Sequence, residues 1–268
     1  MPTKINREEF VSKFNAEGFV VVNELFSTSF IDALIPEFNN AVAQEQSLKQ
    51  DEHQNKFSIL LACPIYGGKF LEVLENENFV QPFNWLLGDT CIVWAYTSTC
   101  VPPQAHNKST TTIHVDYPHF VQNYHAGIGS LILLDDFTEE NGATWYLPFS
   151  HLQEQQPDED YFYKHAKRLV APKGSVFFFN LRLWHASGHN KTDKWRNSLA
   201  VGMKRPYFKQ RIDLPRAMQH LDTSNLSDFV KQKLGYFAQS PASIEEFYEF
   251  ANFRKTLQPS EWENKQTY

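Results

Sequence analysis

Apolar residues recur at helical spacing in the first part of the chain. The first such stretch lies between Asn6, which can cap a helix, and Gly18, which can end one. The run 19–22 is wholly apolar and favours a short strand, after which helical spacing returns as far as about residue 87. The pattern predicts a mainly helical N-terminal layer over residues 1–90.

From residue 91 the pattern changes to short apolar or alternating runs separated by turn residues. Several short strands with turns between them are typical of an antiparallel sandwich or barrel. We therefore expect a mainly β fold with flanking helices, most simply a double-stranded β-helix, the cupin-like jelly roll, over residues 91–205. The expected strands are 91–99, 109–117, 127–134, 143–147, 175–180 and 197–205.

Helical spacing returns in the C-terminal extension, residues 206–268, where Leu226, Phe229, Val230 and Leu234 form an apolar stripe. Such a stripe covers either the β core of the same chain or a partner, and the second use would make a homodimer. A chain of 268 residues suits one large β-rich domain. We expect residues 1–268 to form a single domain.

The composition narrows the class of protein. Hydrophobic residues make up 42% of the chain and include 23 Phe, which indicates a large packed core. No apolar run approaches the roughly 18 residues of a membrane span, and the net charge of −6 argues against nucleic acids and anionic membranes as partners. Three cysteines and a polar start predict a reducing, cytoplasmic location without a secretory signal.

Two metal-binding residue types stand two positions apart in the expected strand 109–117. In a strand His114 and Asp116 would project from the same side. Two imidazoles and one carboxylate form the facial triad of non-heme Fe(II) oxygenases, and His185 is the candidate third ligand. His114 and Asp116 alone are weak evidence, because the pattern His-x-Asp is expected by chance about 0.5 times in a chain of this size. The alternative is a surface strand with two polar residues.

A basic residue, Arg196, follows His185 by eleven positions at the start of an alternating run. A strand there places Arg196 and Ser198 on one face, where a guanidinium and a hydroxyl could hold the far carboxylate of a small dicarboxylic acid. Further basic residues follow the last strand, and we expect them to form a solvated face: Lys204, Arg205, Lys209, Arg211 and Arg216.

The order and spacing of these motifs resemble the phytanoyl-CoA dioxygenase-like (PhyH) family of Fe(II)/2-oxoglutarate-dependent oxygenases, over residues 1 to about 205. One departure is Phe149, which stands where the family usually has Gly. The matching segments are 114–116, 140–144, 147–151, 173–176 and 185–187, with Asn190 and Arg196.

The resemblance implies a mononuclear iron site. His114, Asp116 and His185 would be the catalytic residues and the ligands of Fe(II), with 2-oxoglutarate and O2 as cosubstrates. Asp116 favours hydroxylation over halogenation, because related halogenases carry a small residue at this position.

The resemblance also implies that Arg196 pairs with the distal carboxylate of 2-oxoglutarate. Ser187 is the preferred hydroxyl beside it, and Ser198 and Thr111 are further candidates. For Ser187 the alternative is a polar residue that satisfies a strand end.

The predicted function is the oxidation, most simply the hydroxylation, of an unactivated C–H bond in a small molecule, with release of succinate and CO2. A natural-product or secondary-metabolite intermediate is favoured as substrate over an acyl-CoA, because no phosphate loop or basic cluster accompanies the motif strands. Aromatic residues near the motifs could line a pocket or fill the core: Trp94, Tyr96, Tyr117, Phe120, Tyr124, Trp145 and Trp184.

Three alternatives stay open. The first is an acyl-CoA hydroxylase of the same family. The second is a zinc hydrolase with the same three ligands, against which Arg196 argues because no cosubstrate would need it. The third is a non-catalytic binding protein, which predicts a broken triad, whereas all three residues are present.

Overall fold

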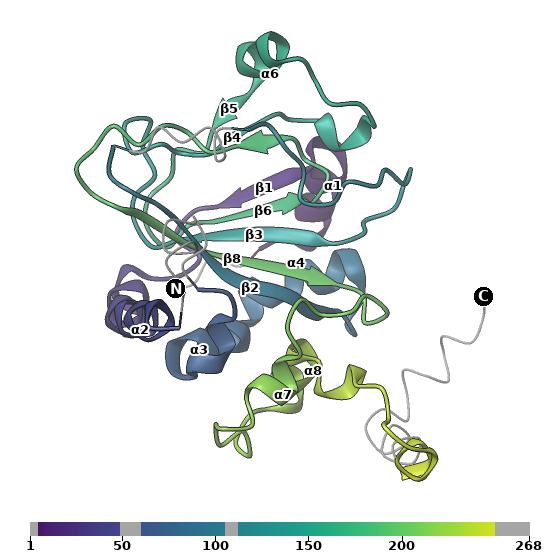
Figure 1. Ribbon diagram of the computed structural model, residues 1–268. Helices are drawn as coiled ribbons and strands as arrows, with labels where there is room; N and C mark the ends of the chain where they lie inside the picture. The colour runs from purple at the N-terminus through teal and green to yellow at the C-terminus, as the bar shows by residue number, and fades with distance from the viewer. Residues whose placement is uncertain (1–4, 49–59, 105–111, 250–268) are drawn as a thin grey trace.

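The computed structural model describes residues 5–48, 60–104 and 112–249 of the chain (Figure 1). No helix in these ranges is both long enough and apolar enough to cross a lipid bilayer. The α-helices are α1 (Arg7–Glu17), α2 (Thr28–Gln46), α3 (Gly68–Glu75), α4 (Glu77–Leu87), α6 (Glu159–His165), α7 (Leu214–Ala217) and α8 (Asp228–Leu234). The strands are β1 (Phe19–Val22), β2 (Ile92–Val101), β3 (Ile128–Leu133), β4 (Trp145–Tyr146), β5 (Lys167–Arg168), β6 (Val176–Asn180), β7 (His185–Ala186) and β8 (Arg196–Lys204).

Helix α1 begins and ends where the sequence predicts. The Asn6 side chain accepts a hydrogen bond of 3.1 Å from the Glu9 amide, and Gly18 adopts a φ of 85°, a left-handed conformation that favours glycine. The Gly18 amide donates to the Phe14 carbonyl, and the chain then enters β1 at Phe19. The turn at Gly18 therefore packs α1 against the strand that follows it.

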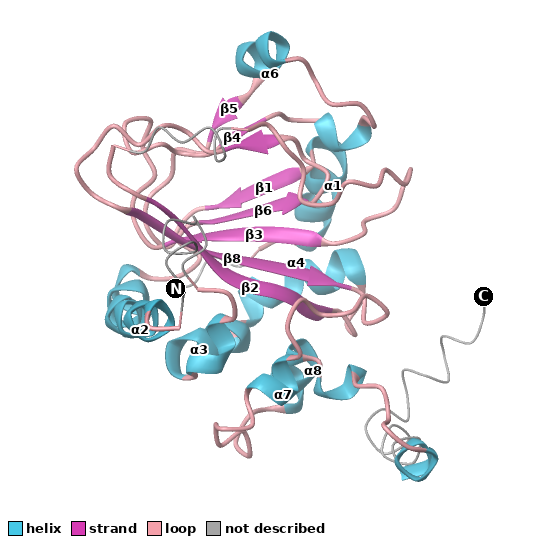
Figure 2. Cartoon of the chain, viewed as in Figure 1, coloured by secondary structure: helices cyan, strands magenta, loops and turns pink. Residues whose placement is uncertain are grey.

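Two antiparallel sheets carry the strands, as Figure 2 shows. The larger sheet has the order β1-β6-β3-β8-β2, and the smaller has the order β5-β4-β7. Helices α1 to α4 cover one face of the larger sheet through an apolar core that includes Phe14, Leu34 and Phe178. A sheet-rich fold with antiparallel sheets and flanking helices is therefore confirmed.

The opposite face of the larger sheet turns toward the smaller sheet. The ring of Tyr146 on β4 lies 4.5 Å from that of Phe19 on β1 and 5.0 Å from that of Phe177 on β6. Strands distant in sequence thus meet, and this face is where the candidate site lies.

The predicted strand 109–117 is wrong for the part of it that the structure describes. His114 makes only a single antiparallel bridge, to His185, and the chain bends at Asp116. Pro118 follows closely and has no amide hydrogen with which to extend a ladder. The two candidate ligands therefore come from irregular backbone, whereas the other five predicted strands are present within a few residues of their expected bounds.

Helix α8 of the C-terminal extension packs on its own chain. Val230 and Leu234 are fully buried in the core that the N-terminal helices share. The ammonium of Lys233 donates 2.6 Å hydrogen bonds to the Asn84 side chain and the Asp89 carbonyl. Part of the predicted apolar stripe thus covers the chain's own core.

Candidate metal and cosubstrate site

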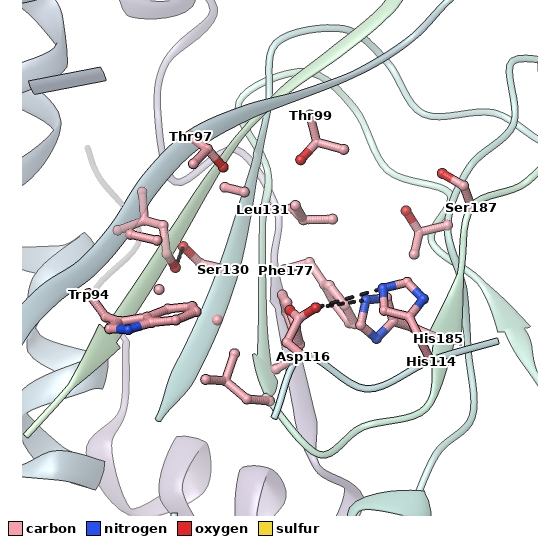
Figure 3. A pocket seen from close by; sticks show the side chains of 18 of the residues that line it. Trp94, Thr97, Thr99, His114, Asp116, Ser130, Leu131, Phe177, His185 and Ser187 are labelled. Carbon is pink, nitrogen blue, oxygen red and sulfur yellow. Dashed lines mark hydrogen bonds and ion pairs between the residues drawn. The ribbon is translucent and has the colours of Figure 1, made fainter. Parts of the chain in front are cut away.

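A cavity of about 380 Å³ is lined by residues of both sheets (Figure 3). Successive side chains of a strand point to opposite faces, and on β8 the residues that line the cavity include Arg196, Ala200 and Gly202. The smaller sheet contributes His185 from β7. The cavity therefore lies on the face of the larger sheet that the helices leave open.

The three predicted metal ligands meet at this cavity, and Figure 3 shows their side chains grouped. The Nε2 atoms of His114 and His185 lie 3.7 and 3.8 Å from Oδ1 of Asp116. One possible ligand atom from each residue lies within 4.8 Å of the others. Both separations from Asp116 are less than twice a metal–ligand bond of about 2.1 Å, so one cation could contact all three side chains.

The backbone aligns the two imidazoles. His114 and His185 exchange amide-to-carbonyl hydrogen bonds of 3.0 Å across their bridge. Their Nδ1 atoms lie 2.9 Å from the carbonyls of Thr112 and Leu183, which can only accept, so each Nδ1 carries the hydrogen. Each Nε2 therefore has its lone pair free for a metal ion.

Burial affects the two histidines differently. The side chain of His185 is 13% exposed and that of His114 is 47% exposed. Burial lowers the pKa of His185, and the neighbouring Asp116 carboxylate opposes this shift. A lowered pKa keeps the His185 imidazole neutral, which is the form that binds metal, in mildly acidic solution.

Arg196, the first residue of β8, lines the same cavity and is 1% exposed. Its guanidinium lies 4.2 Å from the centre of the Phe137 ring, and Nη1 donates to the Gly142 carbonyl. Its Nε atom is buried without a hydrogen-bond partner among the described residues. Burial lowers the pKa of Arg196 to about 9, so it stays protonated at neutral pH. A buried cation with an unused donor is suited to hold an anion.

The predicted hydroxyl groups are placed differently from one another. Ser187 lines the cavity, whereas Ser198 is fully buried and donates its hydroxyl to the Thr99 carbonyl at 2.9 Å. Thr111 lies outside the described residues.

The sequence reasoning missed Thr99 and Thr144, which also line the cavity. Thr99 pairs with Ser198 between β2 and β8, and only the strand register reveals that position.

Arg182 is a further residue that the sequence reasoning missed. Its guanidinium donates to the carbonyls of Tyr117 and Pro118 at 3.4 and 3.1 Å, and to those of Gln153 and Glu154 at 2.8 and 3.0 Å. Tyr117 directly follows Asp116, and Arg182 precedes His185 by three residues. Arg182 therefore ties together the two segments that carry the candidate ligands.

The prediction of a solvated basic face after β8 is wrong for Lys204. This residue is the last of β8 and is 4% exposed.

Among the aromatic candidates, Trp94 lines the cavity, whereas Tyr96 belongs to the core on the helical side of the sheet. Strict alternation would place Trp94 and Tyr96 on one face, but the register of β2 against β8 shifts between Val93 and Ala95, and this β-bulge at Trp94 puts the two rings on opposite faces.

Known proteins resemble this chain in sequence and in structure. The uncharacterized protein Rv1501 of Mycobacterium tuberculosis is 23% identical over 260 residues, which cover 93% of this chain and 95% of the relative. HygX from Streptomyces hygroscopicus, solved with nickel and 2-oxoglutarate bound, has a TM-score of 0.62 at 14% identity, with 77% of this chain and 89% of HygX covered. SnoN, a non-heme alpha ketoglutarate dependent epimerase from nogalamycin biosynthesis, has a TM-score of 0.56 at 18% identity, with 75% and 83% covered. At these identities the two structures show a shared fold.

The sequence model of one family matches residues 14–198. This range is well over half of the chain and includes the three candidate ligands and Arg196. The match ends within β8, so that Lys204 and the C-terminal extension lie beyond it. The chain belongs to the phytanoyl-CoA dioxygenase (PhyH) family.

Proposed function

We propose that this protein is an Fe(II)/2-oxoglutarate-dependent dioxygenase that oxidises an unactivated C–H bond of a small molecule and releases succinate and CO2. The observation that carries the proposal is one cavity that holds the convergent His114, Asp116 and His185 together with the buried Arg196. This combination suits a metal ion and a dicarboxylate that bind side by side. The 2-oxoglutarate bound to HygX, a protein of the same fold, supports the choice of dicarboxylate.

The residues fit these cofactors. Two neutral imidazoles and one carboxylate are the donor set of non-heme Fe(II), and the unused Nε of Arg196 suits the far carboxylate of 2-oxoglutarate. When bound, Fe(II), 2-oxoglutarate and O2 supply the oxidising power that the protein's side chains lack.

The chain's own residues position and shield the reactants. Arg196 fixes the orientation of the dicarboxylate, and the hydroxyl groups of Ser187 and Thr99 line the same cavity. Phe177 and Phe179 present apolar rings to this space, and the Phe179 ring lies 5.4 Å from that of His185. These rings limit the access of water to the metal ligands.

Hydroxylation is the most direct reaction, and the proposed substrate is a natural-product or secondary-metabolite intermediate. The cavity of about 380 Å³ favours a free small molecule over an acyl-CoA, and the origin of SnoN in nogalamycin biosynthesis is in line with this choice.

We also propose that the two facing sheets form a double-stranded β-helix in a single domain, and that the protein is cytoplasmic. A homodimer is a further proposal, and solution scattering that gives a monomer mass would remove it.

The proposal is tested by adding Fe(II) and then 2-oxoglutarate to the metal-free protein without oxygen. We expect a visible charge-transfer band from the chelated complex, and we expect His114→Ala to lose it. His165→Ala, which changes a histidine on α6 away from the ligand cluster, should retain the band. Folded, iron-loaded protein without a band would reject 2-oxoglutarate chemistry and favour the hydrolase or the binding protein.

A further inference from the structure

Lys204 is a second buried cation on the strand that carries Arg196. Side-chain alternation places both residues on the same face of β8, together with Ala200 and Gly202, which line the cavity. Arg196 is 1% exposed and Lys204 is 4% exposed. The cavity-facing side of β8 therefore begins and ends with a buried positive charge.

Aromatic rings surround the Lys204 ammonium. Its Nζ atom lies 3.7 Å from the centre of the Trp94 ring, 4.9 Å from that of Tyr117 and 5.1 Å from that of Phe208. Within the described residues, no carboxylate forms a salt bridge with it. Ring faces attract a cation but replace only part of the hydration that an ammonium loses on burial. The Asp116 carboxylate attracts Lys204 from beyond salt-bridge distance, and Asp116 is itself a candidate metal ligand, so no anion lies in direct contact with the ammonium.

The sheet beside Lys204 carries small residues. Gly129 pairs with Gly202 between β3 and β8, Ala95 pairs with Gly202 between β2 and β8, and all three line the cavity. A Cβ atom at Gly202 would stand 3.5 Å from the Trp94 ring, so the missing side chain leaves space there. Figure 3 shows Trp94 across the cavity from Asp116 and the two histidines. At Gly129 the Phe179 ring already fills the place a Cβ atom would take, so the open floor for a substrate lies at Ala95 and Gly202, next to the Trp94 ring.

We propose that Lys204 binds a negatively charged group of the substrate, and that the enzyme acts on small acids that carry one negative charge, such as monocarboxylates. The inference rests on the proposed function and names its substrate class. Lys204 lies next to Trp94, which lines the cavity, and one ammonium balances one negative charge, whereas Arg211, which lines the cavity itself, is exposed. Lys204 lies beyond the residues that match the family, which suits a residue that selects the substrate.

Matched acids and amides test this inference. The protein is loaded with Ni(II) in place of iron, saturated with 2-oxoglutarate without oxygen, and titrated calorimetrically with butanoate, butanamide, 3-phenylpropanoate and 3-phenylpropanamide. Saturating 2-oxoglutarate keeps the probe acids away from Arg196. We expect the wild type to bind an acid about 10-fold or more tightly than its amide, because only the acid pairs with the buried ammonium.

Variants assign this preference to Lys204. Lys204→Met should reduce it to within about twofold, and Lys204→Arg should keep it. Lys209→Met makes the same change in net charge at an exposed lysine and should also keep it. Thermal unfolding checks that each variant folds, and Lys204→Gln replaces Lys204→Met if the latter does not. The visible band of the Fe(II)–2-oxoglutarate complex should be the same in Lys204→Met as in the wild type.

Equal binding of acid and amide by the wild type, or no binding of either acid, overturns the inference. An acid preference that persists in Lys204→Met overturns it as well. Phenyl phosphate binding more tightly than 3-phenylpropanoate would overturn the assignment to acids with a single charge. Absence of the visible band in the wild type is a separate result, because it rejects the proposed function and not the charge preference.

Discussion

Arg196 and the three candidate metal ligands are held by two different kinds of backbone. Arg196 begins a nine-residue strand that has hydrogen-bonded neighbours on both sides, β3 and β2. His114 and Asp116 lie on irregular backbone, and His185 is on a strand of two residues. Their side chains are also more exposed, at 47% for His114 and 36% for Asp116.

This difference shows how one cavity can serve two needs. Under the proposed function Arg196 pairs with a cosubstrate that does not change, so it can be fixed at the start of an interior strand, where the ladder and close packing hold it. Under the same proposal a metal has to stay open to O2 and substrate, and its candidate ligands lie on short or irregular segments whose imidazoles are held by hydrogen bonds to carbonyl groups. The two parts should therefore respond differently to mutation.

The largest effect is expected from His185→Ala. Loss of the least exposed ligand leaves two donors, so we expect iron retention and turnover to be abolished. Iron content after desalting, measured together with succinate release, checks this result. Activity equal to that of the wild type would remove His185 from the site.

Arg196→Ala should affect the cosubstrate and leave the metal in place. Removing a bidentate charged partner costs about 3 kcal/mol, which raises the 2-oxoglutarate requirement roughly 100-fold. Titration of the visible band with 2-oxoglutarate measures the change, and iron content serves as the internal control. Arg196→Lys should recover part of the loss, and an unchanged requirement would show that another residue anchors the cosubstrate.

Arg182→Met should show the opposite pattern. It removes the hydrogen bonds that hold the segment after Asp116, so we expect roughly 10-fold weaker metal binding, as for other groups that orient metal ligands. The 2-oxoglutarate requirement of the metal-saturated variant should change much less. Arg7→Met on α1 is the matched surface control. Equal losses for metal and cosubstrate would indicate general unfolding instead.

The smallest effect concerns pH. His125 accepts a hydrogen bond at Nδ1 from Asn180 and donates from Nε2 to Asn15, both at 2.9 Å. Burial, followed by the charges of His151 and Arg205, lowers the pKa of His125 to about 4. The unfolded chain takes up this proton near pH 6.5, whereas the folded protein resists until about pH 4.

The stabilisation from neutral His125 is therefore complete above pH 6.5 and is lost as the pH falls toward 4. After allowance for the partly exposed ring, we expect about 1 kcal/mol. Urea unfolding at pH 7.5 and pH 5.0 checks this, and His125→Gln should show a smaller loss on acidification. An equal loss in the variant would assign the acid sensitivity to other groups.

Local signals in the sequence were sufficient for the regular elements. Asn6 and Gly18 mark the ends of α1, because capping and left-handed backbone depend on residue type alone. The pairing of His114 with Asp116 was found through strand alternation, although the backbone there is not a strand. Both side chains still reach the cavity, because the bridge to His185 fixes the segment.

Features that depend on tertiary contacts could not be predicted. Lys204 looked like part of a charged surface, since nothing next to it in the sequence shows that Trp94 and Tyr117 would cover it. Arg182 donates hydrogen bonds to backbone carbonyl groups. Every residue has such a group, so the sequence contains no partner residue type from which this contact could be predicted.

The strand order also has a consequence for the protein as it is synthesised. β1 leaves the ribosome among the first elements, yet its partner β6 begins only at Val176. A nascent chain that ends before residue 185 has His114 and Asp116 but no third ligand. Long-range pairings of this kind form late, because the intervening loop must close first. The proposed iron site therefore cannot assemble before residue 185 has been synthesised, and a translation product cut short before β7 cannot form the triad.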